Sequence, residues 1–179
     1  MNIDPVIYRG RPEERRSAAE ERAYDALDAL GIEYERMDHD PAFTMEACEE
    51  IDRLMDMKAC KNLFLTNKQK NRFFLVVIRG DKRFITKDMS AQLSLPRLSF
   101  AHSDIMEELL GCTPGSVSIL GLANDHEAKV TLIVDKDVPK QEFFGCHPCL
   151  NSSSLKMKTE DIFGKFIPST GRKPIYFEC

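Results

Sequence analysis

The strongest folding signal in the chain is a pair of apolar segments, residues 61–66 and 72–79, separated by the polar residues 67–71. Both segments are rich in Leu, Val, Ile and Phe, which favour strands, and the residues between them suit a turn. Two such strands joined by a short polar connection form a β-hairpin. The middle of the chain is therefore predicted to supply an antiparallel pair to a sheet.

Helices are predicted on both sides of this hairpin. One is expected to begin at Pro12, because proline is tolerated in the first turn, and to end at Gly31. Thr44 suits the N-cap of a second helix that runs to about Leu54. The other expected segments are an irregular arm at 1–10, extended segments at 32–37, 83–86, 97–101, 116–120, 129–135, 155–158 and 174–178, and helices at 87–95, 104–110 and after a cap at Thr159.

Strands grouped in hairpins, with short helices between them, indicate an α+β fold. We expect a single domain with a mixed, largely antiparallel sheet, curved in a barrel-like way around a pocket and flanked by helices. A chain of 179 residues is long enough to enclose one such core.

The composition restricts where the protein works and what it binds. No apolar run is long enough to span a bilayer, no leader-like segment opens the chain, and the six cysteines suit reduced thiols, so a cytoplasmic protein is expected. Residues 59–100 carry nine Lys and Arg against two Asp and Glu, although the net charge is −4. This basic stretch suits either an anionic partner such as nucleic acid or solvated strand edges.

The most unusual segment for chemistry is 143–151, Phe-Phe-Gly-Cys-His-Pro-Cys-Leu-Asn. It fits three kinds of site: half of a metal site, a redox Cys-x-x-Cys, or a binding and catalytic loop centred on His147. A redox motif should open a helix, whereas Leu-Asn-Ser-Ser-Ser follows here, and a zinc site needs a second ligand pair that the other cysteines do not supply. The loop centred on His147 is therefore favoured over both thiol interpretations.

Other nucleophilic and basic side chains are less distinctive. A Ser-His-Asp or Cys-His triad stays open, since such partners meet only in space. Cys60 is a conceivable nucleophile, but a buried cysteine at the start of a strand is the better interpretation. His39, His102 and His126 are expected to be solvated. Lys61, at the head of a core strand, suits either a solvated charge that protects the strand or a group that holds a phosphate or carboxylate.

Two short motifs, taken together, resemble a known family. Lys-Asn-Leu-Phe-Leu at 61–65 and Gly-Cys-His-Pro at 145–148 are similar to the Lys-Asn-Leu-Phe and Gly-x-His-Pro motifs of the YbaK/prolyl-tRNA-synthetase editing-domain superfamily, and most similar to its free-standing alanyl-tRNA(Pro) deacylase branch. Further similarity in order and spacing is found at 41–44, 97–101 and 110–117. The resemblance extends from residue 17 to the C-terminus, which leaves 1–16 as an N-terminal extension. Cys146 and Cys149 are not part of the family pattern.

The resemblance implies an enzyme that hydrolyses the ester of mischarged tRNA(Pro), most of all Ala-tRNA(Pro). A synthetase site built for proline discriminates poorly against a smaller amino acid, since each missing methylene is worth only ~1–3 kcal/mol, so a second site must remove alanine. The expected partner is the tRNA(Pro) acceptor stem, with an association with prolyl-tRNA synthetase also expected, and no cofactor, metal, membrane or DNA. Serine and cysteine esters stay open as substrates.

The resemblance also implies roles for single residues. Lys61 would hold the terminal phosphate or ribose, Gly145 and its neighbours would present N–H groups to a developing oxyanion, and His147 would orient the substrate. The other implied residues are Asn62, Phe43, Thr44, Met45, Pro148 and Asn151 for substrate binding, and Arg97, Lys68, Lys70 and Arg72 for RNA contact. Two alternatives remain: a non-catalytic tRNA-binding or regulatory module of this fold, and a thiol-redox or metal protein that uses Cys146 and Cys149.

Overall fold

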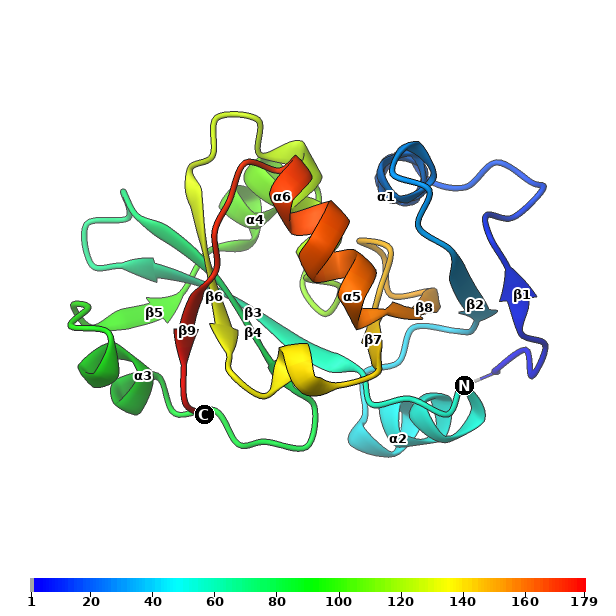
Figure 1. Cartoon of the computed structure of the whole chain (residues 1–179), viewed down its shortest axis with the longest axis horizontal. Helices are drawn as coiled ribbons and strands as arrows, with labels where there is room; N and C mark the ends of the chain where they lie inside the picture. The colour runs from blue at the N-terminus through cyan, green and yellow to red at the C-terminus, as the bar shows by residue number, and fades with distance from the viewer. Residues whose placement is uncertain (1) are drawn as a thin grey trace.

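The structure is a computed structural model that describes residues 2–179, except for the side chain of Met45. Its strands form a four-stranded sheet, in the order β1-β2-β8-β7, and a five-stranded sheet, in the order β5-β3-β4-β6-β9 (Figure 1). The strands are β1 (Tyr8–Arg9), β2 (Tyr34–Asp38), β3 (Cys60–Asn67), β4 (Phe73–Arg79), β5 (Leu98–Phe100), β6 (Val130–Asp135), β7 (Phe143–Cys146), β8 (Ser153–Lys158) and β9 (Ile175–Phe177).

The predicted hairpin is confirmed and forms the centre of the five-stranded sheet. β3 and β4 pair antiparallel, from Cys60 opposite Arg79 to Thr66 opposite Phe73. The turn between them is closed by Asn67, whose Oδ1 accepts hydrogen bonds from the backbone N–H groups of the two residues that precede β4. β5 pairs antiparallel with β3, whereas β6 and β9 run parallel to β4 and to one another, so the sheet is mixed.

The four-stranded sheet is antiparallel throughout, and it meets the five-stranded sheet at one point. β2 pairs with β1 and β8, and β8 pairs with β7. An isolated parallel bridge between Ala59 and Gly145 links the start of β3 to β7. The α+β fold is therefore confirmed, but its strands make two joined sheets that do not close into a barrel.

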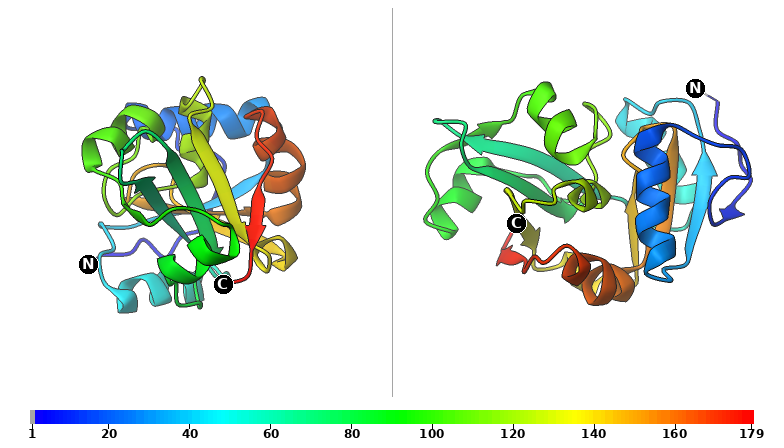
Figure 2. Two further views of the ribbon diagram at one scale, coloured as in Figure 1. Left: turned by 90° about the vertical axis from the view of Figure 1, so that its left-hand side faces the viewer. Right: turned by 90° about the horizontal axis from the view of Figure 1, so that it is seen from above.

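The helices cover the faces of the two sheets. They are α1 (Ala18–Ala29), α2 (Met45–Leu54), α3 (Thr86–Gln92), α4 (Ser103–Leu110), the 3₁₀ helices η1 (Ile119–Asn124) and η2 (Val138–Lys140), and a continuous run of α5 (Thr159–Asp161), the π-helical η3 (Ile162–Phe166) and α6 (Ile167–Ser169). Figure 2 shows α1 lying along the four-stranded sheet and the α5–α6 run beside β9. The large core cluster joins α1, α4, η1 and the α5–α6 run to the inner faces of both sheets.

Three local predictions were wrong. The first helix begins after Ser17 rather than at Pro12, because Ser17 and Glu20 form a reciprocal capping box. Residues 83–85 are not a strand but lead directly into α3. The apolar run at 116–120, expected as a strand, instead enters η1 at Ile119. The prediction failed because the periodicity of a short buried apolar run does not distinguish a strand from a helix.

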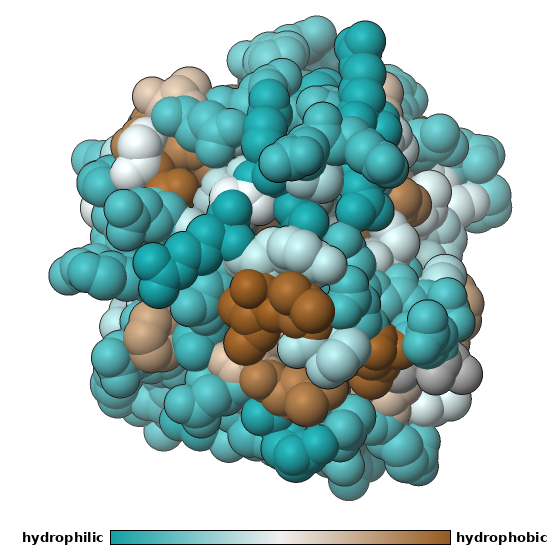
Figure 3. Space-filling model, turned by 90° about the vertical axis from the view of Figure 1, so that its right-hand side faces the viewer, coloured by the Kyte–Doolittle hydropathy of each residue, from teal (hydrophilic) through white to brown (hydrophobic). Residues whose placement is uncertain are grey.

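The N-terminal segment is more ordered than the predicted irregular arm. Tyr8 and Arg9 form β1 against β2, and Ile3 makes an isolated bridge with His39. Figure 3 views the face that carries β1, where apolar surface is visible among polar surface, and Val6 and Ile7 are 48% and 42% exposed. Within residues 2–179, no helix is both long enough and apolar enough to cross a membrane.

Candidate active site

The bridge between the two sheets puts Lys61 and His147 at equivalent positions along their two segments. Each residue lies two positions beyond the bridged pair, Ala59 and Gly145, and the bridge is parallel. Side chains alternate along a strand, so the residues one position beyond the bridge, Cys60 and Cys146, face the other way. Both cysteines are in the large core cluster, which confirms the alternation. Lys61 therefore lies on the opposite face of β3 from Cys60, and His147 directly follows the last residue of β7.

Gly145 lets the two strands approach closely. A Cβ atom at this position would lie 2.7 Å from Met57 Sδ and 2.9 Å from Ala59 Cα. Because the second contact is with backbone, it could not be relieved by a side-chain rotation. Glycine is thus required at this junction for packing, independently of any role of its N–H group.

His147 is held in one tautomer by its hydrogen bond to the backbone. Its Nδ1 lies 2.8 Å from the carbonyl oxygen of Ser153, which can only accept, so Nδ1 carries the proton. The other ring nitrogen, Nε2, is then an unprotonated acceptor. Burial lowers the pKa of His147 below its ordinary value of 6.5, which keeps the ring neutral near pH 7. The side chain can therefore accept a hydrogen bond from a substrate hydroxyl, amine or water.

His39 is buried beside His147, contrary to the prediction that it is solvated. It is 7% exposed, and its ring meets that of His147 edge to face with the centroids 5.9 Å apart. Nδ1 donates to the carbonyl of Asp40 at 2.8 Å, and Nε2 accepts from Ser154 Oγ at 3.0 Å. Burial lowers the pKa of His39 as well. A sequence signal existed, because extending the predicted strand by two residues puts His39 on the same face as the buried Met37.

Asn151 joins the loop after β7 to the segment that precedes α2. Its Oδ1 accepts from the backbone N–H of Ala42 at 3.1 Å, and its Nδ2 donates to the Ala42 carbonyl at 2.9 Å. The next residue, Phe43, is 76% exposed. A Cβ at Gly115, where φ is +86°, would lie 3.3 Å from Phe43 Cε1 and 3.6 Å from Asn151 Nδ2. Three separate chain segments therefore meet around the Phe43 ring.

The remaining predicted substrate-binding residues are Thr44, Pro148 and Met45. Thr44 caps α2, since its Oγ1 accepts from the N–H of Ala47 at 3.2 Å. Pro148 is buried in the loop after β7. Met45 is the first residue of α2, but its side chain lies outside the described part of the structure, so its expected role in the pocket stays a prediction.

Lys61 and Asn62 point to opposite faces of β3. Lys61 Nζ donates to the backbone carbonyl of Lys82 at 2.9 Å. Asn62 shares the core-facing side with Cys60 and Phe64; its Nδ2 donates to the Cys60 carbonyl at 3.2 Å, and its buried Oδ1 has no partner among residues 2–179. Asn62 therefore supports the strand that carries Lys61 without extending the same surface.

The four predicted RNA-binding residues lie together at the other end of β3. Lys68, Lys70 and Arg72 belong to the β3–β4 turn, and Leu98, opposite Asn67, brings Arg97 beside it; all four are exposed. Arg72 lies over the Phe74 ring, with its guanidinium carbon 5.3 Å from the centroid. Seven residues of strand separate Lys68 from Lys61, or roughly 23 Å at ~3.3 Å per residue. We call these four residues the distal basic cluster.

The thiols near the loop are buried. Cys60, Cys112, Cys146 and Cys149 are all at most 8% exposed. Burial raises the pKa of Cys146 to about 12, so this thiol is protonated near pH 7 and is a poor nucleophile. Among residues 2–179, no three His, Cys, Asp or Glu side chains are grouped so that they could hold a metal ion. The burial of these thiols makes them poor candidates for nucleophilic or redox chemistry.

Comparison with known proteins identifies the family of the chain. The profile of the "Aminoacyl-tRNA editing domain" family matches residues 39–164. The chain is 34% identical over 136 residues to the prolyl-tRNA editing protein ProX of Acetoanaerobium sticklandii, covering 76% of this chain and 83% of that protein. It is 32% identical over 168 residues to the prolyl-tRNA synthetase associated domain-containing protein 1 of Bos taurus, covering 90% and 94%.

A solved structure shares the fold. The crystal structure of a protein provisionally described as a trans-editing enzyme for prolyl tRNA synthetase superposes with a TM-score of 0.67, covering 92% of this chain and 99% of that one. The two sequences are 13% identical, so the likeness concerns the fold alone.

Proposed function

Since the chain belongs to the aminoacyl-tRNA editing domain family, we propose that it is a free-standing hydrolase that removes a wrong amino acid from tRNA(Pro), with Ala-tRNA(Pro) as its main substrate. The observation that carries the proposal is the parallel bridge between Ala59 and Gly145, which joins the segment that leads to Lys61 to the segment that leads to His147. A site built at this bridge would combine a cation, a neutral acceptor and a loop of backbone N–H groups.

The proposed chemistry needs orientation and charge stabilisation more than a protein nucleophile. An aminoacyl ester is already activated, so a positioned water can attack its carbonyl carbon; the bond from that carbon to the ribose oxygen then breaks, and the ribose oxygen takes up the proton that the water gives up. As the tetrahedral intermediate forms, its oxyanion is stabilised by N–H groups of the loop that begins at Gly145. The neutral Nε2 of His147 accepts a hydrogen bond from the substrate and so fixes its orientation. Lys61 holds the phosphate or ribose of the terminal nucleotide.

The preference for alanine is proposed to come from a small side-chain pocket that has Phe43 in its wall. Asn151 fixes the backbone of Ala42 through two hydrogen bonds, and Gly115 packs against the Phe43 ring. A wall held in this way would exclude a side chain larger than alanine by overlap, which is the selectivity that a second sieve requires. Thr44, Met45 and Pro148 are proposed to complete the wall.

The distal basic cluster is proposed to bind the tRNA backbone away from the 3′ end. Its separation from Lys61, roughly 23 Å by strand length, suits contacts farther along the acceptor stem rather than with the aminoacyl group. We also propose that the protein acts in the cytoplasm and associates with prolyl-tRNA synthetase. The editing domain is proposed to begin at residue 17, after the N-terminal extension of residues 1–16.

A panel of substrates tests the function. Purified protein is incubated with tRNA(Pro) charged with alanine, serine, cysteine or proline, and ester loss is followed at pH 7 with a Lys61→Ala variant beside it. The proposal expects fast loss of alanine, slow loss of proline, and a large decrease in the variant. Salt-sensitive tRNA binding without ester turnover would instead support the non-catalytic binding module. Turnover that disappears in a Cys146→Ser/Cys149→Ser variant with an intact fold would support the thiol alternative.

A further inference from the structure

We propose that Lys82 and Asp135 are positioning residues that fix the ammonium group of Lys61 and keep its charge available to the substrate. The inference rests on the function proposed above, since it concerns how Lys61 is held. Lys82 has two separate roles in the structure. Its backbone carbonyl accepts the hydrogen bond from Lys61 Nζ at 2.9 Å, and its own side chain binds two carboxylates.

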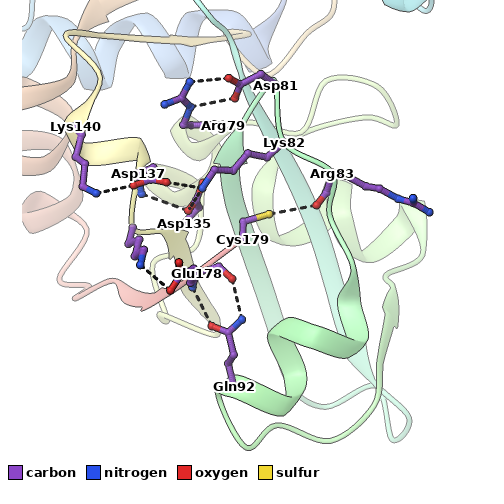
Figure 4. A network of polar contacts seen from close by, with 11 residues as sticks. Arg79, Asp81, Lys82, Arg83, Gln92, Asp135, Asp137, Lys140, Glu178 and Cys179 are labelled. Carbon is purple, nitrogen blue, oxygen red and sulfur yellow. Dashed lines mark hydrogen bonds and ion pairs between the residues drawn. The ribbon is translucent and has the colours of Figure 1, made fainter.

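The side chain of Lys82 anchors the connection between β4 and α3. Its Nζ lies 2.9 Å from Asp135 Oδ1 and 2.7 Å from Asp137 Oδ2, as Figure 4 shows. The Asp135 side chain is 0% exposed, and its other oxygen, Oδ2, has no hydrogen-bond partner within residues 2–179. A buried carboxylate with only one satisfied oxygen depends strongly on its cation, because a buried charge without a partner is costly. Lys82 is therefore held firmly in place.

The rest of the connection between β4 and α3 is also constrained, which fixes the direction of the Lys82 backbone carbonyl. A Cβ at Gly80 would lie 2.2 Å from the Ala59 carbonyl oxygen, which fixes the start of the connection against the bridge between the sheets. At its other end, the Cys179 thiol donates to the Arg83 carbonyl at 3.5 Å. Asp135 ends β6 and pairs with Phe177 of β9, so the anchor belongs to the sheet itself.

The arrangement also separates Lys61 from the nearby negative charges. Within residues 2–179, no carboxylate forms an ion pair with Lys61, and the hydrogen-bond partner of its ammonium group is a neutral carbonyl. Lys82 binds Asp135 and Asp137, and Lys140 binds the other oxygen of Asp137 at 2.6 Å. If Lys82 were uncharged, these carboxylates would attract Lys61 instead. The pair thus positions Lys61 and also prevents its neutralisation.

A double-mutant cycle on ligand binding tests the inference. The variants are Lys82→Met, Lys61→Ala and their combination, and the probe is a tRNA(Pro) acceptor microhelix that ends in a non-hydrolysable 3′-alanyl amide. We expect Lys82→Met to weaken binding about tenfold when Lys61 is present and less than twofold when Lys61 is replaced, since residues in one network are not additive. Lys82→Arg, which keeps the charge, should restore most of the affinity.

Arg79→Met is the matched control, because Arg79 forms an exposed ion pair with Asp81 at the start of the same connection. Its binding should stay within twofold of the wild-type value. Equal weakening by Lys82→Met in both backgrounds, or no weakening at all, would overturn the inference.

An activity assay and a crystal structure distinguish failure of the proposed deacylase function from failure of the proposed positioning role of Lys82. If wild-type protein hydrolyses none of the charged tRNA(Pro) substrates, the proposed function fails, and the binding cycle still reports whether Lys82 and Lys61 are coupled. A crystal structure of Lys82→Met provides a readout without any ligand. Displacement of Lys61 Nζ towards Asp135 would support the positioning role, whereas retention of its bond to the carbonyl of residue 82 would overturn it.

Discussion

The rings of His39 and His147 meet edge to face with their centroids 5.9 Å apart, and burial lowers the pKa of both. Each ring donates from Nδ1 to a backbone carbonyl, to Asp40 in one case and to Ser153 in the other. Protonating either ring would place a positive charge in a buried site beside the other imidazole. The pair therefore makes the site sensitive to acid.

The first prediction concerns the pH dependence of stability. Burial lowers the pKa of both histidines below 6.5, their ordinary value, so the unfolded chain binds more protons than the folded chain as acid is added. The free energy of unfolding should therefore be highest above about pH 6.5, where the histidines are neutral in both states, and should decrease as the pH falls below that value. Urea denaturation between pH 5 and 8 measures this decrease, and His147→Asn should make it shallower.

His126→Asn serves as the control for this experiment, because His126 lies at an exposed position between η1 and β6. It should leave the pH dependence unchanged. An unaltered slope in His147→Asn would show that the buried pair is not its source.

The second prediction concerns the junction of the sheets. Gly145→Ala should destabilise the protein by about 1–3 kcal/mol, because the added methyl group would lie 2.9 Å from the Ala59 backbone and the strands would have to separate. Thermal and urea denaturation give the change. Gly164→Ala is the matched control: nothing lies within 4 Å of its added Cβ in the helical run that follows Thr159, so it should stabilise the protein by about 0.5–1 kcal/mol. Equal effects of the two changes would contradict the packing role of Gly145.

Some features of the fold can be predicted from the sequence because their signals are local. The β3–β4 hairpin was predictable because strand composition and turn chemistry agree over adjacent residues. The loop centred on His147 was predictable because glycine and proline restrict the backbone on both sides of a histidine. Each of these signals is local and requires no knowledge of the residues that pack against it.

The features that were missed depend on residues far apart in the chain. The contact of Lys61 with the Lys82 carbonyl is formed across a strand pair and a connection, and no residue type signals a backbone acceptor. The burial of His39 depends on Ser154, which is 115 positions away. The first helix was placed too early for a different reason: Pro12 permits a helix start, but the capping box at Ser17 stabilises one.

The third prediction concerns the distal basic cluster. Replacing Lys68, Lys70, Arg72 and Arg97 together by glutamine should weaken binding to tRNA(Pro) and reduce the slope of log affinity against log salt by about 0.7–0.9 for each phosphate that the variant no longer neutralises. The maximal rate with bound substrate should change little, because the cluster lies roughly 23 Å from Lys61 by strand length. Lys173→Gln, at an exposed position between α6 and β9, is the control. An unchanged salt slope in the fourfold variant would remove the cluster from the RNA surface.

The last prediction concerns selectivity at Phe43. The ring is 76% exposed, so Phe43→Ala removes little buried area and should change the free energy of unfolding by less than about 1 kcal/mol. Removing the ring should nevertheless remove the proposed wall that Asn151 and Gly115 support. We expect hydrolysis of Pro-tRNA(Pro) to rise at least tenfold relative to Ala-tRNA(Pro). The measurement is the ratio of kcat/KM values for the two substrates, with exposed Phe100→Ala as the aromatic control on β5. If the ratio is the same in Phe43→Ala and wild type, Phe43 is not the wall that excludes proline, and the selectivity must come from residues deeper in the loop.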